Sequence, residues 1–189
     1  MAISIDPQTP HYDVRPLFPS LVLETRVPEY RSLVEIVYKQ RDKHDGLQAS
    51  NIGGWHSPIQ PIPELLHKYI PFSKWKGACW YMINGFTHGN YSHTHPNNHW
   101  SGVLWIKVPR LNPAELVFEH PDRFAQFGAI QSIGDKYPDV KESYNYVPSF
   151  SYPPEEGKML LFPASLRHHV RISQSSTDRI VLSFNLTLL

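Results

Sequence analysis

Short apolar stretches separated by proline-containing turns recur along the second half of the chain, and they constrain its fold more than any other feature. Proline cannot donate a hydrogen bond to a sheet ladder, so it marks strand ends, edges and turns. The 189 residues include 18 prolines against 10 glycines, and 13% of them are aromatic. This combination favours many short strands over a helical bundle.

The expected strands are runs rich in β-branched, aromatic and aliphatic residues bounded by turn residues. They cover residues 14–18, 21–25, 75–86, 101–108, 116–118, 146–152, 158–162, 167–172 and 179–188. Residues 51–58 are expected to form a loop. Between residues 119 and 143 the pattern fades into Pro, Asp, Gly and Lys, which is typical of either a lid or a mobile loop.

One region follows a helical period instead. Apolar residues recur at positions 30, 33, 34, 37 and 38, which predicts an amphipathic helix over residues 29–43 that packs on a sheet. A second, shorter helix is expected to begin near Pro63 and to bury Leu65, Leu66 and Tyr69. The fold class is therefore mainly β (α+β): a single domain over residues 1–189, built as a double-stranded β-helix, or jelly roll, with one or two N-terminal helices on a sheet.

Composition narrows the classes of partner. Charged residues make up 19% of the chain and the formal net charge is +1, so we expect no broad nucleic-acid surface. No apolar run is long enough to cross a bilayer, and the N-terminus does not resemble a secretion signal. The single cysteine, Cys79, lies in an apolar run and is expected in the core. We expect a cytoplasmic protein without membrane partners, with a small-molecule or peptidyl substrate, and allow for a homodimer.

The histidine pattern His93-x-His95 is the strongest chemical signal. Side chains two residues apart on an extended segment point to the same face, so both imidazoles can reach one metal ion. His168, far along the chain, could complete a facial set of three ligands with open positions for substrate or oxygen. His169 should point to the opposite face of its strand. His88, His99 and His120 are further candidates for pocket or substrate contacts.

Five segments carry a resemblance to a known family. They are His93-x-His95-Pro96, residues 101–109, Leu116-x-Phe118, residues 157–170 and residues 179–185. In order and content the chain from Trp75 to its C-terminus resembles the 2-oxoglutarate- and Fe(II)-dependent oxygenases related to prolyl 4-hydroxylase. The resemblance implies hydroxylation of an unidentified substrate, with formation of succinate and CO2.

The resemblance also implies residue roles. His93, His95 and His168 would bind Fe(II), and Arg179 would pair with the distal carboxylate of 2-oxoglutarate. A guanidinium is well suited to that task because it binds a carboxylate through two parallel hydrogen bonds.

Other residues are candidates for binding the co-substrate. Ser183 and Asn185 share the face of Arg179 by the period of two and could contact the same ligand. Asn84 is a candidate partner for its C1 carboxylate, and Trp105 could line its pocket. A buried amide and a core indole explain Asn84 and Trp105 nearly as well.

The chain departs from the family pattern at His95, where an Asp or Glu is usual. A neutral imidazole there raises the net charge of the site by one. Either His95 binds the iron, or it lies outside the ligand set and a water or another residue completes it.

Two other functions remain open on sequence grounds. The spacing of His93, His95, His99 and His168 imitates cupin motifs, which would give a metal-dependent dioxygenase or isomerase that does not use 2-oxoglutarate. A cupin does not require Arg179, or Ser183 and Asn185 on the same face of the strand. The third reading is a non-catalytic β-sandwich binding module, which predicts no stoichiometric metal.

Overall fold

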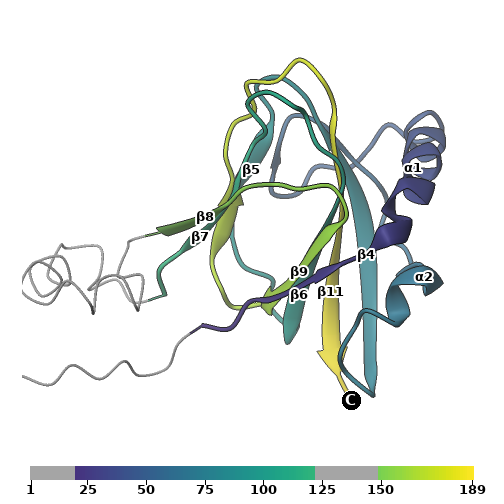
Figure 1. The fold of residues 1–189 in the computed structure, drawn as a ribbon, viewed down its shortest axis with the longest axis vertical. Coiled ribbons are helices and arrows are strands. Elements are labelled where there is room, and N and C mark those ends of the chain that lie inside the picture. The colour runs from purple at the N-terminus through teal and green to yellow at the C-terminus, as the bar shows by residue number, and fades with distance from the viewer. Residues whose placement is uncertain (1–19, 122–148) are drawn as a thin grey trace, which may run out of the picture.

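The computed structural model describes residues 20–121 and 149–189, which form two facing β-sheets with helices on one side (Figure 1). The strand expected at residues 14–18 lies outside the described residues, as does the part of the 119–143 segment beyond residue 121. The question of a lid there therefore stays open.

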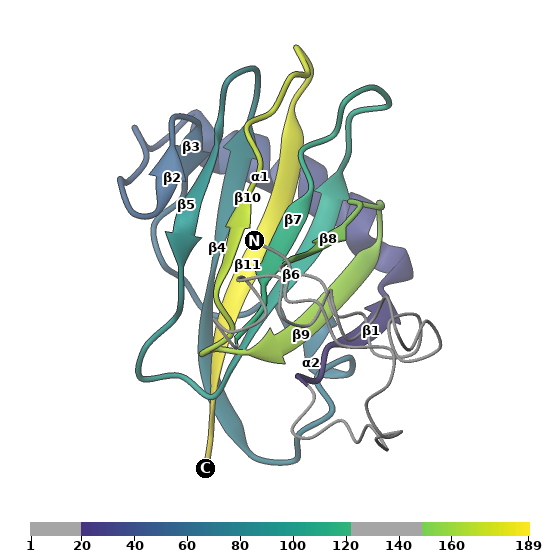
Figure 2. The same ribbon diagram turned by 90° about the vertical axis from the view of Figure 1, so that its left-hand side faces the viewer.

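The larger sheet has six strands in the order β1-β9-β6-β11-β4-β3, and every pair is antiparallel. The smaller sheet has five strands in the order β2-β5-β10-β7-β8, also antiparallel. Figure 2 shows the smaller sheet in front of the larger one. The strands of the larger sheet are β1 (Leu23–Arg26), β3 (Trp55–His56), β4 (Trp75–Asn84), β6 (Trp100–Lys107), β9 (Lys158–Pro163) and β11 (Arg179–Leu188). Those of the smaller sheet are β2 (Asn51–Ile52), β5 (Gly89–His93), β7 (Leu116–Glu119), β8 (Ser149–Tyr152) and β10 (His168–Val170). This is the predicted double-stranded β-helix.

The predicted amphipathic helix covers the outer face of the larger sheet (Figure 1). It starts as a 3-10 turn, η1 (Pro28–Ser32), and continues as α1 (Leu33–Arg41). Proline fits at this start because its missing N–H would have no helical partner there. The second helix, α2 (Glu64–His67), is a single turn that buries Leu66 fully. Leu65 and Tyr69 are only partly buried, contrary to prediction.

Strand β11 separates two apolar cores by the alternation of its side chains. Ile180, Leu182 and Phe184 pack toward the helices. Val181 packs into the second core, between the two sheets. The polar residues Arg179 and Ser183 share the inner face with Val181. Near its start, β11 therefore carries polar side chains on the face toward the smaller sheet and apolar side chains on the face toward the helices.

The segment predicted as a loop at residues 51–58 instead holds two strands of two residues each. Gly53 and Gly54, at φ of 62° and 72°, turn the chain so that β2 joins the smaller sheet and β3 the larger one. A Cβ on Gly54 would lie 2.7 Å from Asn84 Oδ1. The turn therefore closes the space between the sheets at that end.

Two further predictions, on Cys79 and on membrane-spanning segments, can be compared with the structure. Cys79 is fully buried and its thiol contacts the Pro61 carbonyl, as expected of a core residue. Within the described ranges, no helix has both the length and the apolar character needed to cross a membrane.

Candidate active site

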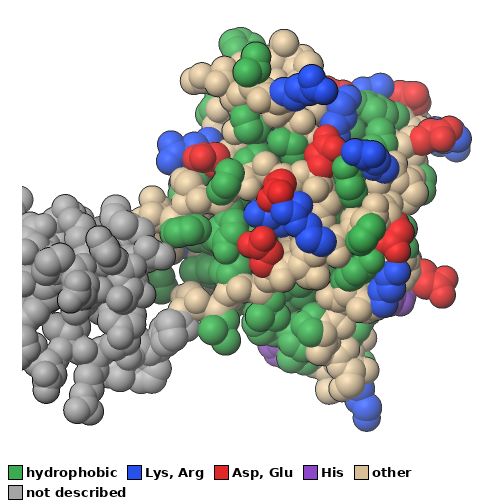
Figure 3. All heavy atoms as spheres, viewed as in Figure 1, with side chains coloured by type: hydrophobic (Ala, Val, Ile, Leu, Met, Phe, Trp, Pro, Cys, Tyr) green, Lys and Arg blue, Asp and Glu red, His purple; other side chains and the backbone are tan. Residues whose placement is uncertain are grey.

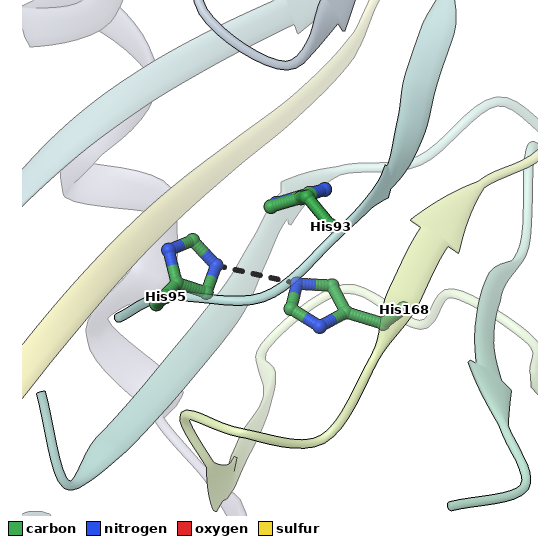
Figure 4. Close-up of side chains that lie close together, drawn as sticks. All are labelled: His93, His95 and His168. Carbon is green, nitrogen blue, oxygen red and sulfur yellow. Dashed lines mark hydrogen bonds between the residues drawn. The ribbon is translucent and has the colours of Figure 1, made fainter. Parts of the chain in front are cut away.

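Two imidazoles from one short segment and a third from far along the chain converge in the structure, as the sequence predicted (Figure 4). His93 ends β5 and His168 begins β10, and the two residues are direct partners in the antiparallel register. Their ring centroids lie 4.5 Å apart. His95 lies just beyond the strand, where its backbone N–H donates to the Ala164 carbonyl and holds its ring 5.1 Å from that of His168.

The hydrogen bonds of two rings fix which nitrogen can bind a metal. His93 Nδ1 lies 2.7 Å from the Tyr91 carbonyl oxygen, and His168 Nδ1 lies 2.8 Å from that of Leu166. A carbonyl only accepts, so each Nδ1 carries the hydrogen and each Nε2 keeps a free lone pair. The protein backbone thus presents both Nε2 atoms as ligands.

The spacing of the donor atoms fits one metal ion. His95 Nε2 and His168 Nε2 are 3.3 Å apart, and one nitrogen from each of the three rings lies within 4.8 Å of the others. Neighbouring nitrogen ligands at about 2.1 Å from an octahedral ion would be about 3 Å apart. In the described part of the chain this is the only such group of His, Cys, Asp or Glu side chains. The ligand set there contains no carboxylate.

Burial keeps the three rings neutral. It lowers the pKa of His95 to about 3 and that of His168 to about 4, with smaller contributions from the neighbouring histidines. It also lowers the pKa of His93. A metal binds the neutral ring, so at neutral pH the site is ready to bind without releasing protons.

The histidines line one pocket together with Arg179 and Ser183. This pocket lies between the sheets, with β5 and β10 on one side and β11 on the other. The rest of its wall is largely apolar, which limits the access of water to the space between Arg179 and the histidines. Apolar lining residues include Trp80, Met82, Val103, Leu116, Phe162 and Val181.

Arg179 is a buried cation that has no counterion among the described residues. Its side chain is 2% exposed, and among the described residues it has no hydrogen bond or ion pair, with Nε fully enclosed. Burial lowers the pKa of its guanidinium to about 10, which leaves it charged at neutral pH. An unpaired buried charge is strongly unfavourable, so the geometry calls for an anion in the pocket.

On the two strands that flank β11, two more buried polar side chains lack hydrogen-bond partners within residues 20–121 and 149–189. Asn84 is the direct cross-strand partner of Arg179, and in this part of the chain neither its amide oxygen nor its amide nitrogen has a hydrogen-bond partner. Trp105 Nε1 is also buried and unpaired, on the neighbouring strand opposite Val181. Native proteins rarely leave such atoms unpaired. The place of Asn84 beside Arg179 differs from its predicted role at the C1 carboxylate, which would lie next to the metal.

Ser183 and Asn185 lie further along β11, toward the histidines. Ser183 lines the pocket opposite Trp80, whose ring is 5.8 Å from that of His95. Six residues of strand separate Asn185 from Arg179 by about 20 Å, so one carboxylate cannot reach both. Asn185 instead accepts a hydrogen bond from Ser101 and contacts His95.

The other histidines of the described residues lie outside the pocket lining. His169 Nδ1 is 3.3 Å from a Glu119 carboxylate oxygen, which confirms that it points away from His168's side of the strand. His88 Nδ1 and His99 Nδ1 accept hydrogen bonds from backbone N–H groups and serve the local fold. His120 is not among the three clustered histidines.

Sequence reasoning missed two polar residues of the pocket. Ser50 Oγ lies 3.4 Å from His93 Nε2, and it accepts a hydrogen bond from the Asn90 amide at 3.1 Å. Asn90 is 6% exposed, and its polarity in the middle of a strand was a signal that could have been used. Ser50 had no such signal, because its place depends on the pairing of the two-residue strand β2 with β5.

The fold and the site define a class of protein, a double-stranded β-helix with places for a metal and an anion in one pocket. A family model described as "Putative 2OG-Fe(II) oxygenase" matches residues 78–185, which is more than half of the chain. The chain belongs to this family. It is an oxygenase that depends on Fe(II) and uses 2-oxoglutarate as co-substrate. Membership decides against the cupin and the non-catalytic binding module.

Solved structures share the fold. A prolyl-4-hydroxylase from Pseudomonas putida superimposes with a TM-score of 0.59 at 12% identity, over 89% of this chain and 92% of that one. A viral collagen prolyl hydroxylase from Paramecium Bursaria Chlorella virus-1, in complex with 2-oxoglutarate, gives 0.57 at 11% identity, over 89% and 96%. HygX from Streptomyces hygroscopicus, with nickel and 2-oxoglutarate bound, gives 0.55 at 9% identity, over 88% and 82%. No curated protein matches the chain in sequence.

Proposed function

We propose that His93, His95 and His168 hold the iron of this oxygenase and that Arg179 binds the distal carboxylate of 2-oxoglutarate. The observation that carries the proposal is the buried, uncompensated Arg179 guanidinium, which lines the same pocket as the three histidines. A dicarboxylate co-substrate placed between them offers one carboxylate to the cation and the other to the metal. The reaction is hydroxylation of a small-molecule or peptidyl substrate, with formation of succinate and CO2.

The residues around Arg179 are suited to the distal carboxylate. The guanidinium offers a pair of parallel donors, and the unpaired Trp105 Nε1–H and Asn84 Nδ2–H are nearby donors of the same kind. Each hydrogen bond to a charged group contributes about 1.5–3 kcal/mol. Ser183, nearer the histidines, is placed for the other end of the molecule.

His95 sets the charge of the site. Three neutral imidazoles contribute no charge. With the distal carboxylate paired to Arg179, only the carboxylate of 2-oxoglutarate at the metal would offset the two charges of Fe(II), whereas an Asp or Glu ligand would add a further negative charge. When bound, iron and 2-oxoglutarate supply the activation of dioxygen for attack on a C–H bond. The chain itself holds the ligand atoms, pairs the distal carboxylate and keeps water out with its apolar wall.

The single buried cysteine and the mixed surface charge support a cytoplasmic location for the enzyme. Burial raises the pKa of the Cys79 thiol to about 12, which disfavours the reactive thiolate, and a single cysteine cannot form an internal disulfide. Acidic and basic side chains are interspersed over the face shown in Figure 3, without a continuous basic stripe that would suit nucleic acid.

The test is co-substrate binding by an Arg179→Ala variant. Titration calorimetry under anaerobic conditions would measure the affinity of the Co(II)-loaded protein for 2-oxoglutarate. We expect Arg179→Ala to weaken binding about 100-fold, since about 3 kcal/mol of charge-assisted hydrogen bonding is lost, while Co(II) affinity is kept. Arg171→Ala is the matched control, because Arg171 is exposed and pairs with Glu115. Unaltered binding by Arg179→Ala would overturn the assignment.

A further inference from the structure

The third histidine of the cluster is held differently from the other two. His93 and His168 each direct Nδ1 to a backbone carbonyl. His95 Nδ1 instead faces the side-chain amide of Asn185 at 3.4 Å. The orientation of His95 therefore depends on a side chain, which a single substitution can change.

Asn185 is itself held in place. It is the direct cross-strand partner of Ser101 in the pairing of β11 with β6, and the Ser101 hydroxyl lies 2.8 Å from its Oδ1. Ser101 is 1% exposed, so water does not compete for this hydrogen bond. The chain Ser101–Asn185–His95 thus runs from the larger sheet to the cluster.

The chemistry of a ligating imidazole decides which end of the amide must face the ring. For His95 Nε2 to offer its lone pair to a metal, the ring hydrogen must sit on Nδ1, where it needs an acceptor. Of the two ends of a carboxamide only the oxygen accepts. A half-turn of the Asn185 amide supplies it, and the amide nitrogen then donates to Ser101 Oγ, which serves equally well as acceptor or donor.

We infer that Asn185 is a positioning residue that presents its carbonyl oxygen to His95 Nδ1–H and so fixes His95 as a ligand through Nε2, with Ser101 holding the amide. The inference rests on the proposed three-histidine iron site. It gives Asn185 a role other than contact with 2-oxoglutarate. The present separation of 3.4 Å needs to shorten by only about 0.4 Å to reach an ordinary hydrogen bond.

The experiment compares Asn185→Leu with Asn185→Asp. Leu has a similar volume but cannot accept a hydrogen bond, whereas Asp can. We measure Co(II) affinity by competition with a chelator at pH 7.5, the visible spectrum of the bound Co(II), and the 2-oxoglutarate affinity of the metal-saturated proteins. Loss of an outer hydrogen bond to a ligand typically costs 10- to 100-fold in metal affinity.

We expect Asn185→Leu to bind Co(II) 10- to 100-fold more weakly with an altered spectrum, and Asn185→Asp to bind at least as tightly as the unaltered protein. Once saturated with metal, Asn185→Leu should bind 2-oxoglutarate within about twofold of the unaltered protein. Ser101→Ala, which leaves the amide in place, should show a weakening of about threefold.

Three results would overturn the inference. One is unchanged Co(II) affinity in Asn185→Leu, and another is an equal loss in Asn185→Asp. The third is a loss of 2-oxoglutarate affinity with metal affinity intact, which would make Asn185 a co-substrate contact. Failure of the unaltered protein to bind metal at all would instead overturn the proposed three-histidine site. Thermal unfolding of each variant confirms that it is folded. If Asn185→Leu does not fold, the metal affinities of Asn185→Asp and Ser101→Ala still test the inference.

Discussion

The histidine end and the arginine end of the pocket differ in how far their polar groups are paired within the protein. At the histidine end, backbone carbonyls fix the rings of His93 and His168, a side-chain amide faces the ring of His95, and burial keeps all three imidazoles neutral. At the arginine end, a buried cation, an amide and an indole N–H have no partners in the part of the chain that the structure describes. A neutral set of donors is organised without its metal, whereas a buried charge is satisfied only when its ligand arrives. The difference indicates that the protein prepares the metal site itself and leaves the co-substrate to complete the other end.

Removal of a ligand should have the largest effect. His168→Ala deletes one of the three clustered imidazoles and should reduce Co(II) affinity by more than about 100-fold, which exceeds the usual cost of losing an outer hydrogen bond. His169→Ala is the control, because His169 is the next residue but lies outside the pocket. Chelator competition measures both. Equal affinities in the two variants would remove His168 from the ligand set.

Acidic pH should lower the stability of the metal-free protein, because the clustered histidine rings are buried in the neutral form. The pKa of His168 is about 4 in the folded protein, below its ordinary value of 6.5, so between these values the unfolded chain binds more protons. Stability is therefore full above pH 6.5 and falls as the pH drops toward 4, by about 1.4 kcal/mol per pH unit for each such histidine.

Urea unfolding in the presence of a chelator at pH 7.5, 6.5, 5.5 and 5.0 measures this slope. His168→Leu should show a shallower dependence on pH than the unaltered protein. A flat profile for the unaltered protein down to pH 5 would mean that the rings are already protonated or solvated.

Replacement of the buried charge at the arginine end should stabilise the ligand-free protein. Arg179→Met removes an unpaired charge from the pocket while keeping much of its volume, so the free energy of unfolding of the ligand-free protein should rise by about 1–3 kcal/mol. The added stability given by 2-oxoglutarate should need about 100-fold more of the co-substrate in the same variant. Arg171→Met, at an exposed site, should change stability by less than about 0.5 kcal/mol. A less stable Arg179→Met would show that the guanidinium is compensated.

The smallest effect concerns a single donor beside Arg179. Trp105→Phe removes the unpaired Nε1–H and keeps an aromatic ring, so 2-oxoglutarate affinity should fall about 2- to 10-fold. Trp75→Phe, where the ring packs on His67, is the matched control. Calorimetry of the Co(II)-loaded proteins measures the ratio. An unchanged affinity in Trp105→Phe would place the distal carboxylate out of reach of this indole.

Much of this arrangement could be predicted from the sequence because it follows from strand periodicity. The spacing of His93 and His95, and the alternation along β11 that turns Arg179 and Ser183 inward, are local properties. The meeting of His93 and His168 needed only the family order of the strands.

What the sequence left undetermined depends on register between distant strands. The position of Asn84 opposite Arg179 follows from the pairing of β4 with β11, and that of Ser50 follows from two residues of β2. Neither pairing leaves a local pattern. The single-domain organisation, the homodimer, the substrate and the compartment stay predictions.

The most direct test of the account is anaerobic addition of 2-oxoglutarate to the Fe(II)-loaded protein, followed by visible absorption. If the three histidines hold iron and Arg179 holds the distal carboxylate, a metal-to-ligand charge-transfer band should appear and saturate as 2-oxoglutarate is added. In Arg179→Met the same band should need about 100-fold more 2-oxoglutarate. The account would be contradicted if the unaltered protein bound iron without developing the band, or if both proteins developed it at the same concentration of 2-oxoglutarate.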